Sequence, residues 1–123
     1  MAASGDDNVV QYIVVRKDLL KTLKWPLGAV IAQTCHATTA VYHLYKDDPY
    51  VIKYTSDLDR MRKVVLETED EIALRKLSEE LQNDKIDHKI WIEQPENFAT
   101  CLATKPYPKS IVQHFFKKLK LFK

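Results

Sequence analysis

Residues 9–16, VVQYIVVR, constrain the fold more than any other part of this chain. Six of the eight are β-branched or aromatic, and only Gln11 interrupts the run before Arg16. A strand exposed on one face alternates apolar and polar residues, whereas a strand covered on both faces does not. We therefore expect a central strand with helices on both faces, which is the arrangement of a three-layer α/β domain.

The segment after this strand predicts a loop at 20–27 and then a long helix at 28–45. Apolar or small residues recur there at helical spacing, and one face of the helix is expected to be buried. The members of that stripe are Val30, Thr34, Ala37, Val41 and Leu44. Gln33 and His36 lie off this line, so they are expected on the polar side of the helix.

Two further helices are indicated by caps and periodicity. Thr68 and Glu71 have the spacing of a capping box, which predicts that a helix starts at Thr68. Its buried stripe is Leu74, Leu77 and Leu81. A last helix is expected at 109–120, with an apolar side formed by Ile111, Val112, Phe115, Phe116 and Leu119.

Three more strands are expected at 63–67, 88–92 and 99–104, with a turn at 94–97 between the last two. The element order is then β-α-β-α-β-β-α. Strands separated by helices favour parallel pairing, and the short last connection favours one antiparallel pair. The sequence thus predicts an α/β fold: a three-layer α/β/α domain with a mixed, mostly parallel four-stranded sheet.

The 123 residues, 46% of them apolar, suffice for one core. We expect a single domain at 9–123 after a disordered N-terminus at 1–8. No apolar run approaches the roughly 20 residues that cross a bilayer, and the first residues lack the pattern of a secretory signal. A cytoplasmic location without membrane attachment is therefore expected.

Cys35 and Cys101 show neither metal-ligand spacing nor the framework of a disulfide-rich protein, and both are expected to be reduced thiols in or near the core. Cys35 precedes His36, but successive helix residues point about 100° apart, so the two do not form a nucleophile and base. The four histidines are scattered. No metal and no cofactor is implied.

The C-terminal part is a basic block. After Glu96 the chain has no acidic residue, and its six lysines are Lys105, Lys109, Lys117, Lys118, Lys120 and Lys123. Such a block suits an RNA phosphate backbone, because each neutralised phosphate releases counterions. A solvated helix face that only keeps the protein in solution is an equally good interpretation.

Four sequence blocks occur in the order of a known family's motifs. They are R-x-D-L at 16–19, GAVIAQTCHA at 28–37, KVVL at 63–66, and TCLA at 100–103 with Lys105-Pro106 and the final LKLF. In these blocks the chain resembles the type II peptidyl-tRNA hydrolases, whose motifs include R-x-D-L, G-K-I-A-A-Q-x-x-H-A, K-V-V-L, T-V-L-A-I-G-P and L-K-L. It is most similar to the branch of peptidyl-tRNA hydrolase domain-containing proteins.

The resemblance implies hydrolysis of the ester between a peptide and the 3′ ribose of tRNA. That reaction needs an oriented water, a proton acceptor, and positive charge or N–H donors for the oxyanion. The family's lysine is Ala29 here, and its aspartate motif D-A-G-R-T-Q is replaced by a shorter hairpin at 93–97. The candidate catalytic residues are His36, Glu93 and Thr100. The candidate substrate-binding residues are Asp18, Gln33, Lys24, Lys105, Lys117, Lys118 and Lys120.

Two functions fit these residues. One is an esterase for peptidyl-tRNA, with His36 or Glu93 as the base and with Thr100 and Gln33 orienting the water and the carbonyl. Lys21, Lys24 or Lys105 would then replace the family lysine from another backbone position. The other is a weak or inactive relative that binds tRNA or another RNA, which Ala29 and the short hairpin favour. The sequence leaves this choice open and permits a homodimer.

Each candidate also has a purely structural interpretation. Gln33 and His36 have the pattern of polar helix residues hydrogen-bonded to a loop, and Glu93 that of a solvated carboxylate beside a turn. Thr100 has that of an ordinary strand hydroxyl, and Asp18 that of a loop cap.

Overall fold

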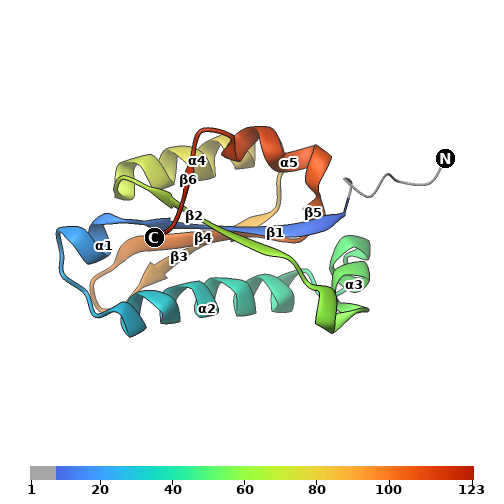
Figure 1. Cartoon of the computed structure of the whole chain (residues 1–123), viewed down its shortest axis with the longest axis horizontal. Helices are drawn as coiled ribbons and strands as arrows, with labels where there is room; N and C mark the ends of the chain where they lie inside the picture. Colours follow the sequence, from blue (N-terminus) through green and yellow to red (C-terminus); the bar gives the residue numbers. More distant parts are fainter. Residues whose placement is uncertain (1–7) are drawn as a thin grey trace.

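Strand β1 (Val9–Arg16) lies in the middle of the sheet in the computed structural model, which describes residues 8–123 (Figure 1). Val10, Tyr12 and Val14 belong to one hydrophobic cluster, and Ile13 and Val15 belong to a second cluster on the other face. Burial on both faces, expected from the absence of alternation, is therefore confirmed.

Three of the four expected strands run in one direction. β2 (Lys63–Thr68) pairs with β1 in parallel, and β4 (Phe98–Thr104) pairs with β1 antiparallel. β3 (His88–Glu93) is antiparallel to β4 and so runs in the direction of β1. The α/β class and the mixed sheet are confirmed.

The sheet has six strands, however, and not four. β5 (Tyr107–Pro108) pairs with the start of β1, and β6 (Lys120–Leu121) pairs with β2 at the sheet edge. Each of these strands has two residues, which is too short to carry the alternation that identifies a strand in a sequence.

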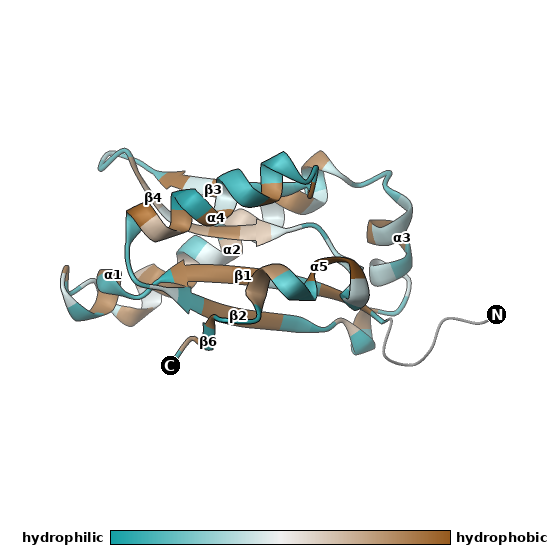
Figure 2. Cartoon of the chain, turned by 90° about the horizontal axis from the view of Figure 1, so that it is seen from above, coloured by the Kyte–Doolittle hydropathy of each residue, from teal (hydrophilic) through white to brown (hydrophobic). Residues whose placement is uncertain are grey.

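The helices form the outer two layers. α2 (Leu27–Leu44) covers one face of the sheet, and α4 (Glu71–Asn83) and α5 (Lys109–Phe116) cover the other (Figure 1). Viewed over α4 and α5, hydrophobic strands lie beneath helices whose outward residues are mostly hydrophilic (Figure 2). This is the expected α/β/α arrangement.

α2 differs from the expectation in which residues it buries. Val30, Ala37 and Val41 are buried as expected, but Leu44 is exposed and Gln33, expected on the polar side, is 2% exposed. The helix packs against β3 and β4, and these strands cover Gln33. The loop expected at 20–27 is interrupted by the end of a short helix, α1 (Asp18–Lys21).

α4 begins two residues later than the capping box predicted, because its N-cap is Asp70 and not Thr68. The Asp70 carboxylate accepts a 2.9 Å hydrogen bond from the backbone N–H of Ala73. Thr68 is the last residue of β2, so the capping-box prediction was wrong. The buried stripe of Leu74, Leu77 and Leu81 is confirmed.

The last helix is also shorter than expected. α5 ends at Phe116 because Lys120 and Leu121 pair with β2 as a strand. Val112 and Phe116 are buried, whereas Ile111, expected on the same side, is 40% exposed. Between α2 and β2 the chain forms α3 (Pro49–Thr55) and a 3-10 turn, η2 (Leu58–Arg60).

The expected disordered segment at 1–8 lies outside the described residues except for Asn8, whose carbonyl accepts a 3.0 Å hydrogen bond from the N–H of Lys109. None of the helices within 8–123 has the length and apolar character needed to cross a membrane.

Candidate active site

The candidate residues from three separate elements meet near one end of the sheet. This is the carboxyl end of the parallel strands β1 and β2, where α1 and the N-terminus of α2 also lie (Figure 1). In open α/β sheets ligands bind outside the carboxyl ends of the strands. The geometry therefore favours a site at this end.

Gln33 is the centre of this group of residues, which we call the Gln33 cluster and which also contains His36, Glu93 and Thr100. Its side-chain amide donates hydrogen bonds of 3.2 Å to the carbonyl of Ala29 and to Oε2 of Glu93. Its Oε1 accepts a 3.1 Å hydrogen bond from the hydroxyl of Thr100, a fully buried residue of β4. One buried amide thus joins α2, the end of β3 and the middle of β4.

Glu93 is the last residue of β3. Its Oε1 accepts a 3.0 Å hydrogen bond from the indole N–H of Trp91. That hydrogen bond, the one from Gln33 and the nearby charge of His36 lower the pKa of Glu93 from its ordinary 4.5, although burial opposes them. The carboxylate is therefore ionised at neutral pH.

His36 lies one turn of α2 after Gln33. Its ring stacks on the indole of Trp91, with centroids 4.8 Å apart and an angle of 18° between the planes. The residue is exposed, so its nitrogens can exchange protons with solvent or with a bound molecule. Glu93 and Thr100 both contact Gln33, and His36 lies beside them on Trp91, so the three expected catalytic residues lie together.

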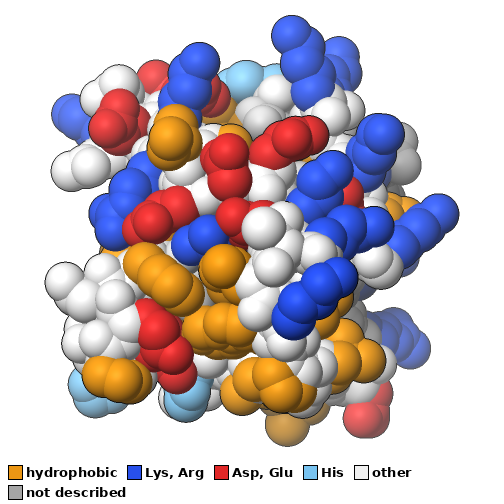
Figure 3. Space-filling view, turned by 90° about the vertical axis from the view of Figure 1, so that its left-hand side faces the viewer, with side chains coloured by type: hydrophobic (Ala, Val, Ile, Leu, Met, Phe, Trp, Pro, Cys, Tyr) orange, Lys and Arg blue, Asp and Glu red, His pale blue; other side chains and the backbone are white. Residues whose placement is uncertain are grey.

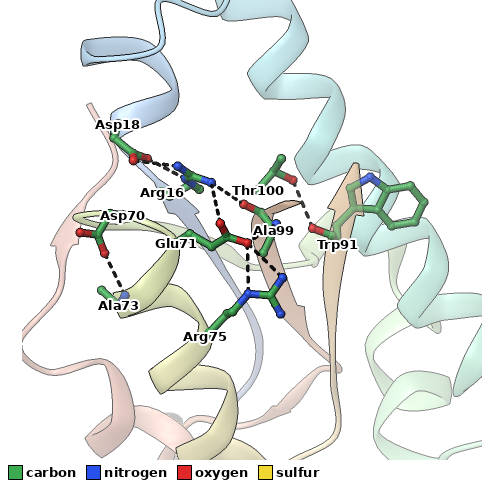
Figure 4. Close-up of polar contacts among 9 residues, drawn as sticks. All are labelled: Arg16, Asp18, Asp70, Glu71, Ala73, Arg75, Trp91, Ala99 and Thr100. Atoms are coloured by element: carbon green, nitrogen blue, oxygen red, sulfur yellow. Dashed lines mark hydrogen bonds and ion pairs between the residues drawn. The ribbon is translucent and has the colours of Figure 1, made fainter. Parts of the chain in front are cut away.

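The backbone that carries Thr100 is held from both sides (Figure 4). Arg16 donates a 2.9 Å hydrogen bond to the carbonyl of Ala99, and Glu71 accepts a 2.9 Å hydrogen bond from the N–H of Ala99. Ala99 is fully buried and directly precedes Thr100. Glu71 was assigned only to a helix start in the sequence, where nothing marks its contact with a residue 28 positions later.

Asp18 forms a bidentate ion pair with Arg16, at 2.7 and 2.8 Å. This pair, with weaker attraction from Glu71, raises the pKa of Arg16, although burial opposes it. Both Asp18 oxygens are engaged by the guanidinium. The structure thus places Asp18 beside the Thr100 backbone as the partner of Arg16.

The surface at this end has separate hydrophobic, acidic and basic areas (Figure 3). Hydrophobic side chains gather in its lower half, on the side of α2, with acidic side chains above them and basic side chains toward the edge where β6 lies. The exposed large apolar residues around the start of α2 are Leu23, Leu27 and Ile31. An apolar surface beside ionised groups suits a substrate with a hydrophobic part and a charged part.

Ala29 stands in the first turn of α2, where no side chain caps the helix N-terminus. A helix N-terminus carries partial positive charge and free N–H groups. Gly28 precedes Gln33 by five residues, or about 7.5 Å along the helix axis. The backbone N–H groups of the first turn are thus close enough to the Gln33 amide for one small molecule to contact both.

The lysines that the sequence assigned to substrate binding are dispersed. Lys24 is exposed in the loop before α2, next to Trp25, whose ring packs 5.8 Å from that of Phe98 at the start of β4. Lys117, Lys118 and Lys120 are exposed on the other side of the sheet, after α5 and in β6.

Lys105 is 6% exposed and forms ion pairs with Asp48 and with Asp87, the latter at 3.0 Å. It lies five residues beyond Thr100 along an extended chain, or about 16 Å. Burial disfavours its charge, but the hydrogen bonds to the two carboxylates outweigh burial and raise the pKa of Lys105. A lysine held in this way does not reach the Gln33 cluster.

The two cysteines differ from each other. Cys101 is buried as expected, and burial raises the pKa of its thiol to about 12, so it stays protonated. Cys35 is exposed, which corrects the expectation of a core position. Within 8–123, no three side chains of His, Cys, Asp and Glu converge to hold a metal ion.

Known proteins are similar to this sequence over nearly its full length. The family described as Peptidyl-tRNA hydrolase PTH2 matches residues 9–122. The mouse and human proteins named "Putative peptidyl-tRNA hydrolase PTRHD1" are 53% identical over 126 residues, which cover 100% of this chain and 90% of each relative. A protein of Thermococcus sibiricus named "Peptidyl-tRNA hydrolase" is 32% identical over 117 residues, covering 90% of this chain and 95% of that protein.

These matches confirm the resemblance that the four sequence blocks indicated, and the match over 9–122 includes every residue of the Gln33 cluster. The chain belongs to the peptidyl-tRNA hydrolase PTH2 family.

Proposed function

We propose that this protein hydrolyses the ester that joins a peptide to the 3′ end of tRNA. The observation that carries the proposal is the Gln33 amide, which contacts Glu93 and Thr100 at once. Gln33 and Thr100 come from motifs shared with the family, and Glu93 supplies a carboxylate although the aspartate motif is missing. The names of the related proteins support the same substrate.

His36 is the proposed proton acceptor. It is exposed beside an ionised Glu93, whose negative charge stabilises the imidazolium that forms when a water molecule loses its proton. Glu93 itself is a weak base, because its lowered pKa makes its protonated form unfavourable. The hydrolytic step adds the water oxygen to the ester carbonyl and then expels the ribose oxygen, which takes a proton back from the imidazolium.

The first turn of α2 is the proposed oxyanion site. Ala29 has no charge to offer, so the backbone N–H groups of Leu27 and Gly28, with the positive end of the helix, take the role of donors. Loss of one oxyanion donor commonly costs about 10² to 10³ in rate. We therefore expect slow hydrolysis compared with enzymes that carry the lysine.

The basic C-terminal residues are the proposed contacts for tRNA phosphates. Lys117, Lys118 and Lys120 are exposed, and the ion pairs described within 8–123 do not involve them. Peptidyl-tRNA is made by ribosomes, so we place the protein with them in the cytoplasm.

The test is single-turnover cleavage of peptidyl-tRNA with the protein in large excess. Wild-type protein should release the peptide faster than buffer alone, and His36→Gln and Glu93→Gln should each lower the rate by about 10²-fold or more. Glu96→Gln is the matched control, since Glu96 is an exposed carboxylate in the same hairpin. A wild-type rate equal to that of buffer would overturn the proposal.

A further inference from the structure

A cavity of about 390 Å³ lies on the face of the sheet opposite to the Gln33 cluster, between α4 and the segment that leads from α5 into β6. A second hollow of about 750 Å³ adjoins it. The two share four lining residues, Lys76, Glu80, Phe115 and Lys118. Together they form a groove along α4, which we call the α4–α5 groove.

Thr68 lines the smaller cavity, at the end of β2. Its side chain is on the same face of β2 as Leu66, which packs in the core beneath α4. Among residues 8–123, Thr68 Oγ1 is the one buried side-chain polar atom without a hydrogen-bond partner. Leaving such a hydroxyl unpaired is costly, so its position calls for a partner from outside the fold.

The hydroxyl can turn toward the cavity without movement of the backbone. The hydroxyl and the methyl group of threonine share one carbon and exchange places between staggered rotamers. Thr68 is 6% exposed and lies at the cavity wall. A ligand group that reaches this wall can therefore pair with Oγ1.

The lining combines an apolar floor with a basic rim. Leu77, Phe115 and Leu119 supply the apolar surface, and Phe115 lies between the two hollows. Lys76, Lys118 and Lys120 line the smaller cavity and take no part in the ion pairs described for 8–123.

Two of the acidic residues in the lining share a single lysine as their ion-pair partner. Glu67 and Glu69 both face Lys17, at 3.9 and 3.6 Å. Glu80 is left as the one unpaired carboxylate in the smaller cavity, against three unpaired lysines. With Lys17 included, the lining has four lysines and three glutamates, a net charge of +1. The cavity therefore favours an anion on the side of the unpaired lysines, with Glu80 available as an acceptor for an amino or hydroxyl group.

We propose that the α4–α5 groove binds single-stranded RNA, with one nucleotide seated in the cavity at Thr68. The base packs on Phe115 and Leu119, Thr68 Oγ1 pairs with its polar edge, and Lys118 and Lys120 hold the phosphate. A purely aliphatic ligand would leave the hydroxyl unpaired, and an inorganic anion would leave the apolar floor exposed. A nucleotide has an aromatic body, polar edges and an anionic group, and stacking on an aromatic side chain is tolerant of sequence.

This inference rests on the proposed function in that both assign RNA as the ligand and both use Lys117, Lys118 and Lys120, but the nucleotide site at Thr68 lies on the face of the sheet opposite to the Gln33 cluster. The second hollow favours an RNA strand over a free mononucleotide as the ligand, because the groove continues past Phe115 to His114 and Lys117. A neighbouring nucleotide of the same strand can lie there with its phosphate near Lys117.

The test is fluorescence anisotropy with a labelled RNA hexanucleotide, a probe that has no ester to cleave. Phe115→Leu keeps an apolar side chain but removes the stacking surface, and it should weaken binding by about 5-fold or more. Lys118→Gln with Lys120→Gln should weaken binding and reduce its dependence on salt. Lys53→Gln on α3, an exposed lysine away from the groove, is the matched control and should change neither.

Thr68→Val gives the sharpest result, because valine has the shape of threonine without the hydroxyl. The variant should be at least as stable as the wild type, since an unpaired buried hydroxyl is removed, and it should bind the hexanucleotide about 2- to 10-fold more weakly. A purely structural Thr68 would change stability and leave binding as it was, which would contradict the proposal.

Two further outcomes overturn it. Adenosine 5′-monophosphate that binds as tightly as the hexanucleotide would identify a free nucleotide as the ligand, and binding of neither would exclude both. Failure of this inference is separate from failure of the proposed function. If the wild type cleaves peptidyl-tRNA but the groove variants bind RNA normally, only the RNA site in the groove is excluded. If binding depends on the groove but no cleavage occurs, only the hydrolase function is excluded.

Discussion

Glu71 accepts a 2.9 Å hydrogen bond from the backbone N–H of Ala99, and this contact ties the start of α4 to the strand that carries Thr100. On the other side of the same residue, Arg16 donates to the carbonyl of Ala99 (Figure 4). Ala99 is buried, so its N–H has no access to water.

Replacement of Glu71 should therefore lower stability. We expect Glu71→Ala to reduce the free energy of unfolding by about 1 to 3 kcal/mol, because a buried N–H loses its acceptor. Glu69→Ala, an exposed carboxylate two residues earlier, should change it by no more than about 0.5 kcal/mol. Urea denaturation of both variants measures the difference, and equal values would contradict the role of Glu71.

The same carboxylate should make stability depend on pH. The hydrogen bond from Ala99, followed by Arg75 and Arg16, lowers the pKa of Glu71 below its ordinary 4.5. A group with a lowered folded-state pKa stabilises the fold above its ordinary value and loses that contribution as the pH falls through the folded value. Wild-type protein should thus lose stability below pH 4.5 more steeply than Glu71→Gln in urea titrations at several pH values.

Ala29→Lys should raise the rate of peptidyl-tRNA cleavage by about 10-fold or more, because it adds a positive charge beside the proposed oxyanion site. The backbone carbonyl of Ala29 would still accept the hydrogen bond from Gln33. Ala29→Met has a similar length without the charge and should leave the rate unchanged. A rate that rises equally in both variants would show that charge is not the cause.

Gly28→Ala should separate substrate approach from folding. An added Cβ at Gly28 meets nothing within 4 Å, and the residue lies in the first turn of a helix, so alanine should keep or raise stability. The extra methyl group stands where the ester is proposed to bind, and cleavage should fall. Thermal unfolding and single-turnover cleavage test both parts, and normal cleavage would place the ester elsewhere.

Lys105→Met should lower the free energy of unfolding by about 2 to 3 kcal/mol, because Asp48 and Asp87 lose the cation between them. The two carboxylates are partly exposed, so the loss should be smaller than for a fully buried pair. Affinity for tRNA should stay unchanged. Lys118→Gln should instead leave the free energy of unfolding unchanged and weaken tRNA binding. Urea denaturation measures the stability, and filter binding measures the affinity.

Much of the fold follows from local sequence. The absence of alternation in 9–16 predicted a strand buried on both faces, and Leu74, Leu77 and Leu81 predicted the buried side of α4. These patterns are reliable because each reports only that one face of an element is buried, and this does not depend on which other element covers that face. The family resemblance likewise depended on short blocks whose residues are contiguous in the chain.

The candidate site depended on contacts that no local pattern records. Gln33 has the spacing of a polar helix residue, yet it is buried because Glu93 and Thr100, 60 and 67 positions away, supply its hydrogen-bond partners. Lys105 has the sequence of a basic tail residue, yet Asp48 and Asp87 enclose it.

The sequence by itself therefore determined the class of fold, the order of most elements and the family. The tertiary structure decided which polar residues are buried together, which lysines remain free, and where the unpaired hydroxyl of Thr68 lies. The physical reason is that apolar periodicity records only the presence of a neighbouring layer, whereas a buried polar group is stable only with a specific partner, and that partner is set by how distant segments pack.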